Sequence, residues 1–71
     1  MKKIIKIDGM GCQHCVNRIT EALSAIDGVE VLEVSLEDKS ATVDVEESIT
    51  DEILMEAIDE EGFEPIECFL A

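Results

Sequence analysis

Apolar residues recur along this chain with two different spacings, and the order of those spacings constrains its fold more than any other feature. In four segments apolar residues alternate with polar ones, which is typical of strands with one buried face. In two others they recur every three or four residues, which is typical of amphipathic helices. The predicted order is strand 3–8, helix 15–25, strand 32–36, strand 41–45, a helix that begins near residue 50, and strand 65–70.

Each predicted strand has one apolar face and each predicted helix one apolar stripe, so these surfaces must be buried against one another. The simplest arrangement is a four-stranded antiparallel sheet with both helices on one face. This is an α+β fold, the ferredoxin-like βαββαβ sandwich. Because the chain has 71 residues, no linker and no low-complexity segment, we expect a single domain over residues 1–71.

Glycines and a capping residue mark the ends of the predicted helices. Asp27-Gly28 supplies a stop for the first helix. Thr50 is a suitable N-cap for the second helix, and Gly62 ends it. The apolar alternation changes phase between Val31 and Leu32, so we expect an irregularity there that resets the strand register.

The predicted core is aliphatic, because the chain has no Trp or Tyr and only two Phe. A chain of this size buries only about 60% of its unfolded surface, which leaves little volume for a deep substrate pocket. The side chains expected to face the core are Ile5, Ile7, Val16, Ile19, Ala22, Leu23, Ile26, Leu32, Val34, Leu36, Ala41, Val43, Val45, Ile53, Leu54, Ala57, Ile58, Ile66, Cys68 and Leu70.

The net charge of −13 excludes several classes of partner. A nucleic-acid backbone or an anionic membrane surface would repel this chain, so we expect neither as a partner. No apolar run is long enough for a signal peptide or a membrane span, and three cysteines do not make a secreted disulfide scaffold. We therefore expect a cytoplasmic protein with reduced thiols and no membrane insertion.

The charge is divided unevenly along the chain. Residues 1–20 carry four cations, Lys2, Lys3, Lys6 and Arg18, against Asp8 alone, which is a local charge of +3. Residues 21–71 carry 17 acidic residues against Lys39, which is a local charge of −16. Two cysteines lie in the first of these stretches, which is the only one that is not acidic.

Those two cysteines belong to the segment 9–15, GMGCQHC, between the first strand and the first helix. Cys12 and Cys15 are three residues apart near a helix N-terminus, where they can turn toward a common point and where anions are favoured. A thiolate is both a metal ligand and a nucleophile, so the pair suits metal binding or thiol exchange. Two soft sulfur donors without a third or fourth ligand suit Cu(I) better than structural Zn(II).

The motif in its setting resembles the heavy-metal-associated domain, which occurs as free copper chaperones and as N-terminal modules of copper-transporting P-type ATPases. The resemblance covers essentially the whole chain and rests on GMGCQHC after a first strand, on Asp27-Gly28-Val29, and on Gly62-Phe63 after the second helix. It implies that Cys12 and Cys15 bind Cu(I) and pass it to a partner's thiols through three-sulfur intermediates. It implies no enzymatic activity.

Two alternatives to a Cu(I) chaperone remain open from the sequence. Within the family, the chain resembles a module of a P-type ATPase, in which Phe is frequent at the position of Phe63, or a homologue that handles Hg(II), Zn(II) or Ag(I). Outside the family, a small dithiol oxidoreductase also places a CxxC pair between a first strand and a first helix. Such folds are expected to end in a helix, however, whereas this chain is predicted to end in a strand.

Four further residues near the motif or on the last strand have expected roles. We expect Met10 to anchor the loop in the core rather than to bind metal, and Phe63 to cap the core beside the loop. We expect His14 to be solvated, with a ligand or charge-tuning role as its alternative. We expect Cys68 to be a buried core thiol, with a role as third ligand as its alternative.

The charge distribution also predicts a kind of partner. Lys6 and Arg18 are the cations nearest the loop and could offset the charge of −1 that two thiolates and Cu(I) make together. The acidic remainder would form a docking face for a basic patch on a copper-transporting P-type ATPase or another metal-handling protein. The expected assembly is a monomer without metal, with a metal-bridged dimer as a further possibility.

Overall fold

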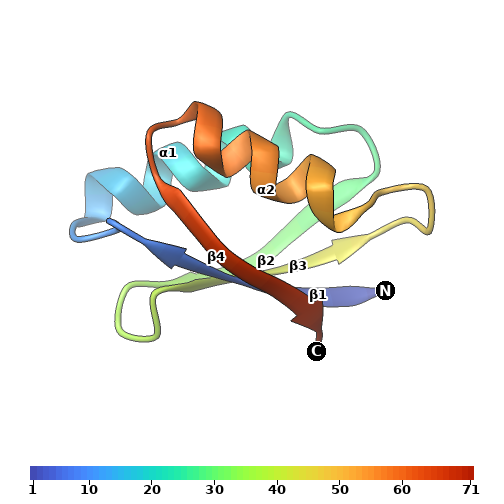
Figure 1. The fold of residues 1–71 in the computed structure, drawn as a ribbon, viewed down its shortest axis with the longest axis horizontal. Coiled ribbons are helices and arrows are strands. Elements are labelled where there is room, and N and C mark those ends of the chain that lie inside the picture. The colour runs from blue at the N-terminus through green and yellow to red at the C-terminus, as the bar shows by residue number, and fades with distance from the viewer.

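The computed structural model describes all residues from 1 to 71 and contains four strands and two helices in the predicted order (Figure 1). Their bounds are β1 (Lys2–Asp8), α1 (Gln13–Ser24), β2 (Val29–Ser35), β3 (Ser40–Val45), α2 (Asp51–Glu60) and β4 (Glu64–Leu70). Neither helix is long and apolar enough to cross a membrane.

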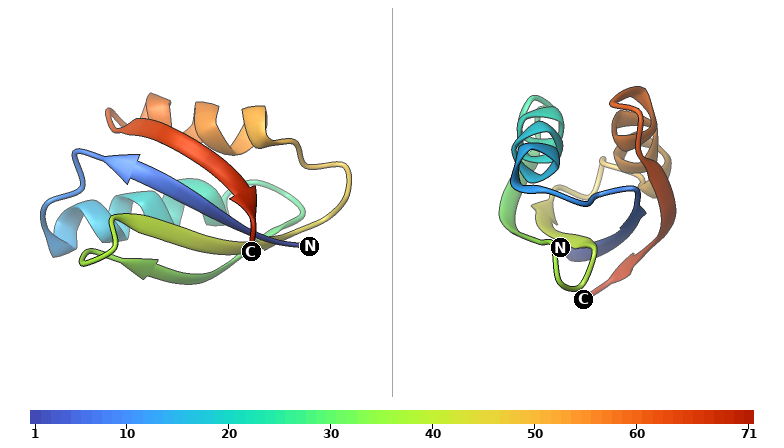
Figure 2. Two further views of the ribbon diagram at one scale, coloured as in Figure 1. Left: turned by 60° about the horizontal axis from the view of Figure 1, so that its bottom comes forward. Right: turned by 90° about the vertical axis from the view of Figure 1, so that its left-hand side faces the viewer.

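The strands form one antiparallel sheet in the order β2-β3-β1-β4. Both helices lie on the same face of this sheet, and the opposite face is left open (Figure 2). The predicted α+β ferredoxin-like fold is therefore confirmed. The loop between β1 and α1 lies at one end of the molecule, and the two chain termini lie at the other (Figures 1 and 2).

The helix ends follow local signals, with one difference from the prediction. Helix α2 is capped as expected, because the Thr50 hydroxyl accepts a hydrogen bond of 3.4 Å from the backbone N–H of Ile53. Helix α1 begins at Gln13, two residues before the predicted start. Cys12 has an extended backbone and is itself the N-cap, so both residues between the cysteines belong to the first helical turn.

The core is an aliphatic layer between the sheet and the two helices. The fully buried side chains of β1 face those of α1 and α2, and only two residues of the core, Met10 and Phe63, are neither aliphatic nor small. The buried apolar residues are Ile5, Ile7, Met10, Ile19, Leu23, Ala41, Val43, Val45, Ile49, Leu54, Ile58 and Phe63. The composition of the predicted core is thus confirmed.

Two register irregularities explain why some residues predicted in the core are exposed. The predicted irregularity in β2 is present, because Val31 pairs with Val43 and Glu33 pairs with Thr42. The residue between them, Leu32, has no register partner, and it is 45% exposed. Its predicted burial is wrong because the bulge removes it from the inward alternation.

The prediction for β4 is wrong in the same way. A register shift opposite Lys6 and Ile7 leaves Ile66 without a register partner, and Ile66 is 53% exposed. Leu70 pairs with Lys3 near the end of the sheet and is also exposed, so only Cys68 of this predicted face packs against the core. In α2 the predicted burial of Ile53 is wrong as well, because the core-facing stripe of that helix is centred on Leu54 and Ile58.

One polar contact ties three elements together beneath the helix layer. Asp51, in the first turn of α2, accepts a hydrogen bond from the ammonium of Lys3 in β1 and another, 3.5 Å long, from the thiol of Cys68 in β4. The Lys3 side chain is only 13% exposed. The hydrogen bond from Lys3 is the main cause that lowers the pKa of Asp51, and the bond from Cys68 adds to it.

This contact makes stability depend on pH. Because the pKa of Asp51 is lower in the folded protein than its ordinary value of 3.8, the carboxylate stabilises the fold fully above that value, and its contribution is lost as the pH falls through the folded pKa. We expect Asp51→Asn to lower the free energy of unfolding at pH 7 by up to about 1 kcal/mol, since the Asp51 side chain is 49% exposed. Chemical denaturation of both proteins at pH 7 and pH 3 should show the difference shrinking at pH 3.

Glu52→Gln is the matched control, because Glu52 occupies the same helical turn and is exposed. It removes an equal charge from the helix N-terminus without breaking the contact to Lys3. An equal loss of stability in both variants, or a difference that is the same at both pH values, would assign the effect to general charge instead.

Candidate metal centre

The loop between β1 and α1 is held in place by a buried methionine. Met10 is only 2% exposed and belongs to the core cluster, which confirms the prediction that it anchors the loop. Gly9 has a φ of +90°, a conformation that side chains rarely adopt, and it turns the chain out of β1. These two residues place Cys12 at the N-cap of α1 and Cys15 in its first turn.

The two thiols meet at this helix end. The Sγ atoms of Cys12 and Cys15 are 3.2 Å apart and share a hydrogen bond. Cys12 is exposed and Cys15 is half-buried, and both thiols are free. The Cys12 side chain makes no capping hydrogen bond to the helix. The site is therefore an open pair of sulfur donors on the surface of the molecule.

The surroundings favour the thiolate form of Cys15. Its pKa is lowered first by the hydrogen bond with the Cys12 thiol and then by a hydrogen bond with the backbone of Gly11. Burial opposes these effects, and the positive charge of Arg18 adds a smaller lowering of the pKa. Because the thiolate is the form that binds soft metals and attacks disulfides, this residue is prepared for either chemistry.

An aromatic ring and a guanidinium group lie beside the loop. Phe63 is 9% exposed, and its Cδ1 atom is 3.9 Å from the position that a side-chain Cβ at Gly9 would occupy. It thus caps the core beside the loop, as predicted. The Arg18 guanidinium carbon lies 5.8 Å from the centre of the Phe63 ring, and its Nε atom is 3.6 Å from Oε1 of Glu61.

Comparison with known proteins decides the family. A model of the heavy-metal-associated domain matches residues 4–64. The chain belongs to the heavy-metal-associated domain family. The match begins in β1, includes both cysteines of the loop and ends at the start of β4, so it spans the fold and the thiol pair together.

Individual members of the heavy-metal-associated family are similar over most of this chain. The copper chaperone CopZ of Staphylococcus epidermidis is 41% identical over 64 residues, which cover 89% of this chain and 94% of that protein. Copper-transporting ATPase 1 of mouse is 40% identical over 63 residues, which are 87% of this chain but 4% of that protein. A solved CopZ metallochaperone superposes with a TM-score of 0.88, at 30% identity, over 93% of this chain and 100% of that one.

The other residues singled out from the sequence lie apart from the thiol pair. His14 is exposed in the first turn of α1. Cys68 lies on β4 opposite Ile5 and packs against the core, but it is only partly buried, so the prediction of a buried thiol is confirmed in part. No group of three His, Cys, Asp or Glu side chains is arranged to hold a metal ion. Lys6 follows the buried Ile5 in β1 and therefore faces the open side of the sheet, away from Phe63.

Sequence reasoning missed the contact among Arg18, Glu61 and Phe63. Arg18 lies on α1, whereas Glu61 and Phe63 follow α2, so no local spacing pattern brings them together. The contact of Asp51 with Lys3 and Cys68 was missed for the same reason. The only sequence signal was that Arg18 is the one cation within the first helix.

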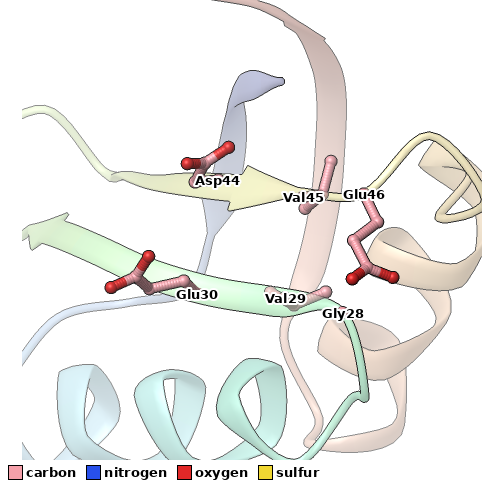
Figure 3. A pocket seen from close by; sticks show the side chains of 6 residues that line it. All are labelled: Gly28, Val29, Glu30, Asp44, Val45 and Glu46. Carbon is pink, nitrogen blue, oxygen red and sulfur yellow. The ribbon is translucent and has the colours of Figure 1, made fainter.

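The one hollow found in the surface lies elsewhere. It has a volume of about 320 Å³ and is lined by Gly28, Val29, Glu30, Asp44, Val45 and Glu46 (Figure 3). Three of these side chains are carboxylates, and all six residues lie where β2 begins and β3 ends. The loop with the cysteines is at the other end of the sheet, so this hollow is no part of the thiol site (Figure 1).

The three cysteines should differ in reactivity. Burial first, and then the carboxylate of Asp51, raise the pKa of Cys68 to about 11. We expect iodoacetamide at pH 7.5 to alkylate the loop cysteines roughly tenfold or more faster than Cys68, because only thiolates react at a useful rate. Mass spectrometry of peptides from a time course measures the three rates.

The same reaction in denaturant is the control, because unfolding removes the local environments and should bring the three rates together. Equal rates for Cys68 and the loop cysteines in the folded protein would contradict the environments described above.

Proposed function

We propose that this protein is a copper chaperone without enzymatic activity that carries Cu(I) on Cys12 and Cys15. The observation that carries the proposal is the open pair of thiols, 3.2 Å apart at the N-terminus of α1, in a chain of the heavy-metal-associated family. Its similarity to a copper chaperone along 94% of that protein supports the same reading.

The chemistry of the pair suits a soft cargo ion. Two thiolates satisfy Cu(I), which accepts two-coordinate sulfur ligation, whereas structural Zn(II) requires four ligands. The exposed side of Cys12 leaves room for an incoming sulfur atom. Transfer then proceeds by ligand exchange: a thiolate of the partner bonds to the ion, a three-sulfur intermediate forms, and one bond to this protein breaks. A second thiolate of the partner then replaces the remaining sulfur of this protein in the same way. The ion stays Cu(I) throughout, so no oxidant or reductant is needed.

Two readings compete with this one. The match to a segment of copper-transporting ATPase 1, together with Phe63 beside the loop, favours a metal-binding module of a P-type ATPase. A homologue that handles Hg(II), Zn(II) or Ag(I) is a further alternative within the family. The lowered pKa of Cys15 also suits a dithiol oxidoreductase. We prefer the chaperone because the similarity to CopZ covers nearly all of that protein.

Replacing the loop cysteines tests the proposal. We expect Cys12→Ser and Cys15→Ser to abolish tight Cu(I) binding and to leave the apo protein folded at room temperature, because the aliphatic core holds the fold. Titration of the reduced protein with Cu(I), Zn(II) and Hg(II) in competition with a chromophoric chelator measures the affinity. Circular dichroism measures the fold.

Cys68→Ser is the matched control and should bind one Cu(I) as the unchanged protein does. Reduction of insulin disulfides by the purified protein, without stoichiometric uptake of Cu(I), would replace the proposal with the oxidoreductase reading. If the protein binds Zn(II) or Hg(II) but not Cu(I), the proposed binding site stands and the proposed metal is wrong.

We further propose that the acidic surface docks a partner with a basic patch, such as a copper-transporting P-type ATPase. Residues 21–71, which carry a charge of −16, form β2, β3, α2 and β4, whereas the loop lies within the positive first stretch. The thiols must stay reduced to hold Cu(I), which suits the cytoplasm. We propose a monomer in the absence of metal, which a metal ion shared between two thiol pairs would convert to a dimer.

Electrostatic docking predicts a dependence on salt. We expect the affinity for a purified metal-binding module of a copper-transporting ATPase to fall several-fold between low ionic strength and about 0.5 M salt, because exposed charges are screened within a few Å at high salt. Surface plasmon resonance or calorimetry at several salt concentrations measures this change. An affinity for the partner that does not change with salt would contradict electrostatic docking. It would not bear on the separate proposal that Cys12 and Cys15 bind Cu(I).

A further inference from the structure

We propose that Arg18 supplies the positive potential at the thiol pair, and that Glu61 limits how much of that potential the pair experiences. The proposal rests on the proposed function, since a dithiolate that holds Cu(I) carries a charge of −1 and a neighbouring cation would stabilise it. According to this proposal, Arg18 and Glu61, which lie outside the loop, tune the affinity of the thiol pair for a soft metal.

The position of Arg18 supports the first half of the proposal. Arg18 lies three residues after Cys15 on α1, so the two side chains are neighbours on one face of the helix. The guanidinium lies over the ring of Phe63, whose Cδ1 atom is 3.9 Å from the position that a Cβ at Gly9 would occupy. Planar guanidinium groups are held well on aromatic faces. The Phe63 ring beside the loop therefore supports the guanidinium of Arg18, whose side chain is 49% exposed.

Its surroundings distinguish Arg18 from the other cations. Lys6 faces the open side of the sheet, and Lys3 is engaged by Asp51. Lys39 lies in the turn between β2 and β3, at the same end of the sheet as the loop, but it is not among the groups that shift the pKa of Cys15. Arg18 is the cation whose charge also lowers the pKa of a loop cysteine.

The position of Glu61 supports the second half. Its Oε1 atom is 3.6 Å from Nε of Arg18, which is too long for a tight hydrogen bond but close enough for a charge interaction. Both side chains are partly exposed, at 49% for Arg18 and 35% for Glu61. The ion pair is therefore loose, so Glu61 offsets part of the positive charge without removing it.

Two substitutions that break the same ion pair separate this role from a structural one. Arg18→Gln removes the cation and should weaken Cu(I) binding about two- to fivefold at low ionic strength. Glu61→Gln releases the cation and should strengthen binding by a similar factor. If the pair only held α1 to the end of α2, both substitutions would act in the same direction, since each removes one partner.

The matched controls carry the same changes of net charge at other places. Lys6→Gln removes a cation on the open face of the sheet, and Glu60→Gln removes the exposed acid next to Glu61. The change in the logarithm of the Cu(I) affinity should be less than half as large for Lys6→Gln as for Arg18→Gln. The same should hold for Glu60→Gln compared with Glu61→Gln. Arg18→Lys should restore part of the affinity, because it keeps the charge and loses the planar stacking.

A second readout works without metal. In a Cys68→Ser background, the loop thiols are reacted with an anionic disulfide, dithiobis-nitrobenzoate, and with a neutral one, dipyridyl disulfide. The rate constant with the anionic reagent divided by that with the neutral reagent reports the local electrostatic potential, because the thiolate fraction affects both rates equally. We expect Arg18→Gln to lower this ratio about two- to fivefold and Glu61→Gln to raise it, and both changes to fade in about 0.5 M salt.

The two readouts distinguish failure of this inference from failure of the proposed function. If the unchanged protein retains no Cu(I), the chaperone reading falls, while the rate ratio still decides whether Arg18 sets the potential. If Cu(I) binds but both substitutions shift the affinity in the same direction, or leave the rate ratio unchanged, Arg18 and Glu61 form a structural contact and the inference is overturned. Lys6→Gln matching Arg18→Gln would also overturn it.

Discussion

Burial of the inward face of β1 is the interaction on which the rest of the structure depends. β1 is a central strand between β3 and β4, and its Ile5 and Ile7 are almost completely buried beneath both helices. The chain then leaves the sheet through Gly9 and re-enters the core at Met10, so the same apolar layer that holds the sheet also fixes the loop. The thiol pair is therefore positioned by aliphatic packing.

The positions of the charged residues explain how a chain with a large negative net charge can hold an anionic site. The acidic residues lie mainly on exposed positions of the helices and of the outer sheet face, where water screens them. Near the thiols the loop backbone, the start of α1 and the guanidinium of Arg18 supply partial or full positive charge. An anionic centre can thus form on a molecule whose overall charge would oppose it.

Much of the fold followed from the sequence because its apolar spacing is regular where the elements are regular. The order of elements and the Thr50 cap depend on neighbours close in sequence, and the irregularity after Val31 was predictable because the apolar alternation changes phase there. The exposure of Ile66 was not predictable, because it results from a shift in the pairing of β4 with β1.

The candidate site divides in the same way. GMGCQHC located Cys12 and Cys15, whereas the charge environment depends on Arg18, Glu61 and Phe63, which meet only in three dimensions. Cys68 shows why such environments matter. It is the same residue type, yet burial and the carboxylate of Asp51 raise its pKa to about 11, while Cys15 has a lowered pKa at the N-terminus of α1. Cys15 and Cys68 thus differ in how readily they form thiolates, because location rather than residue type sets the pKa of a thiol.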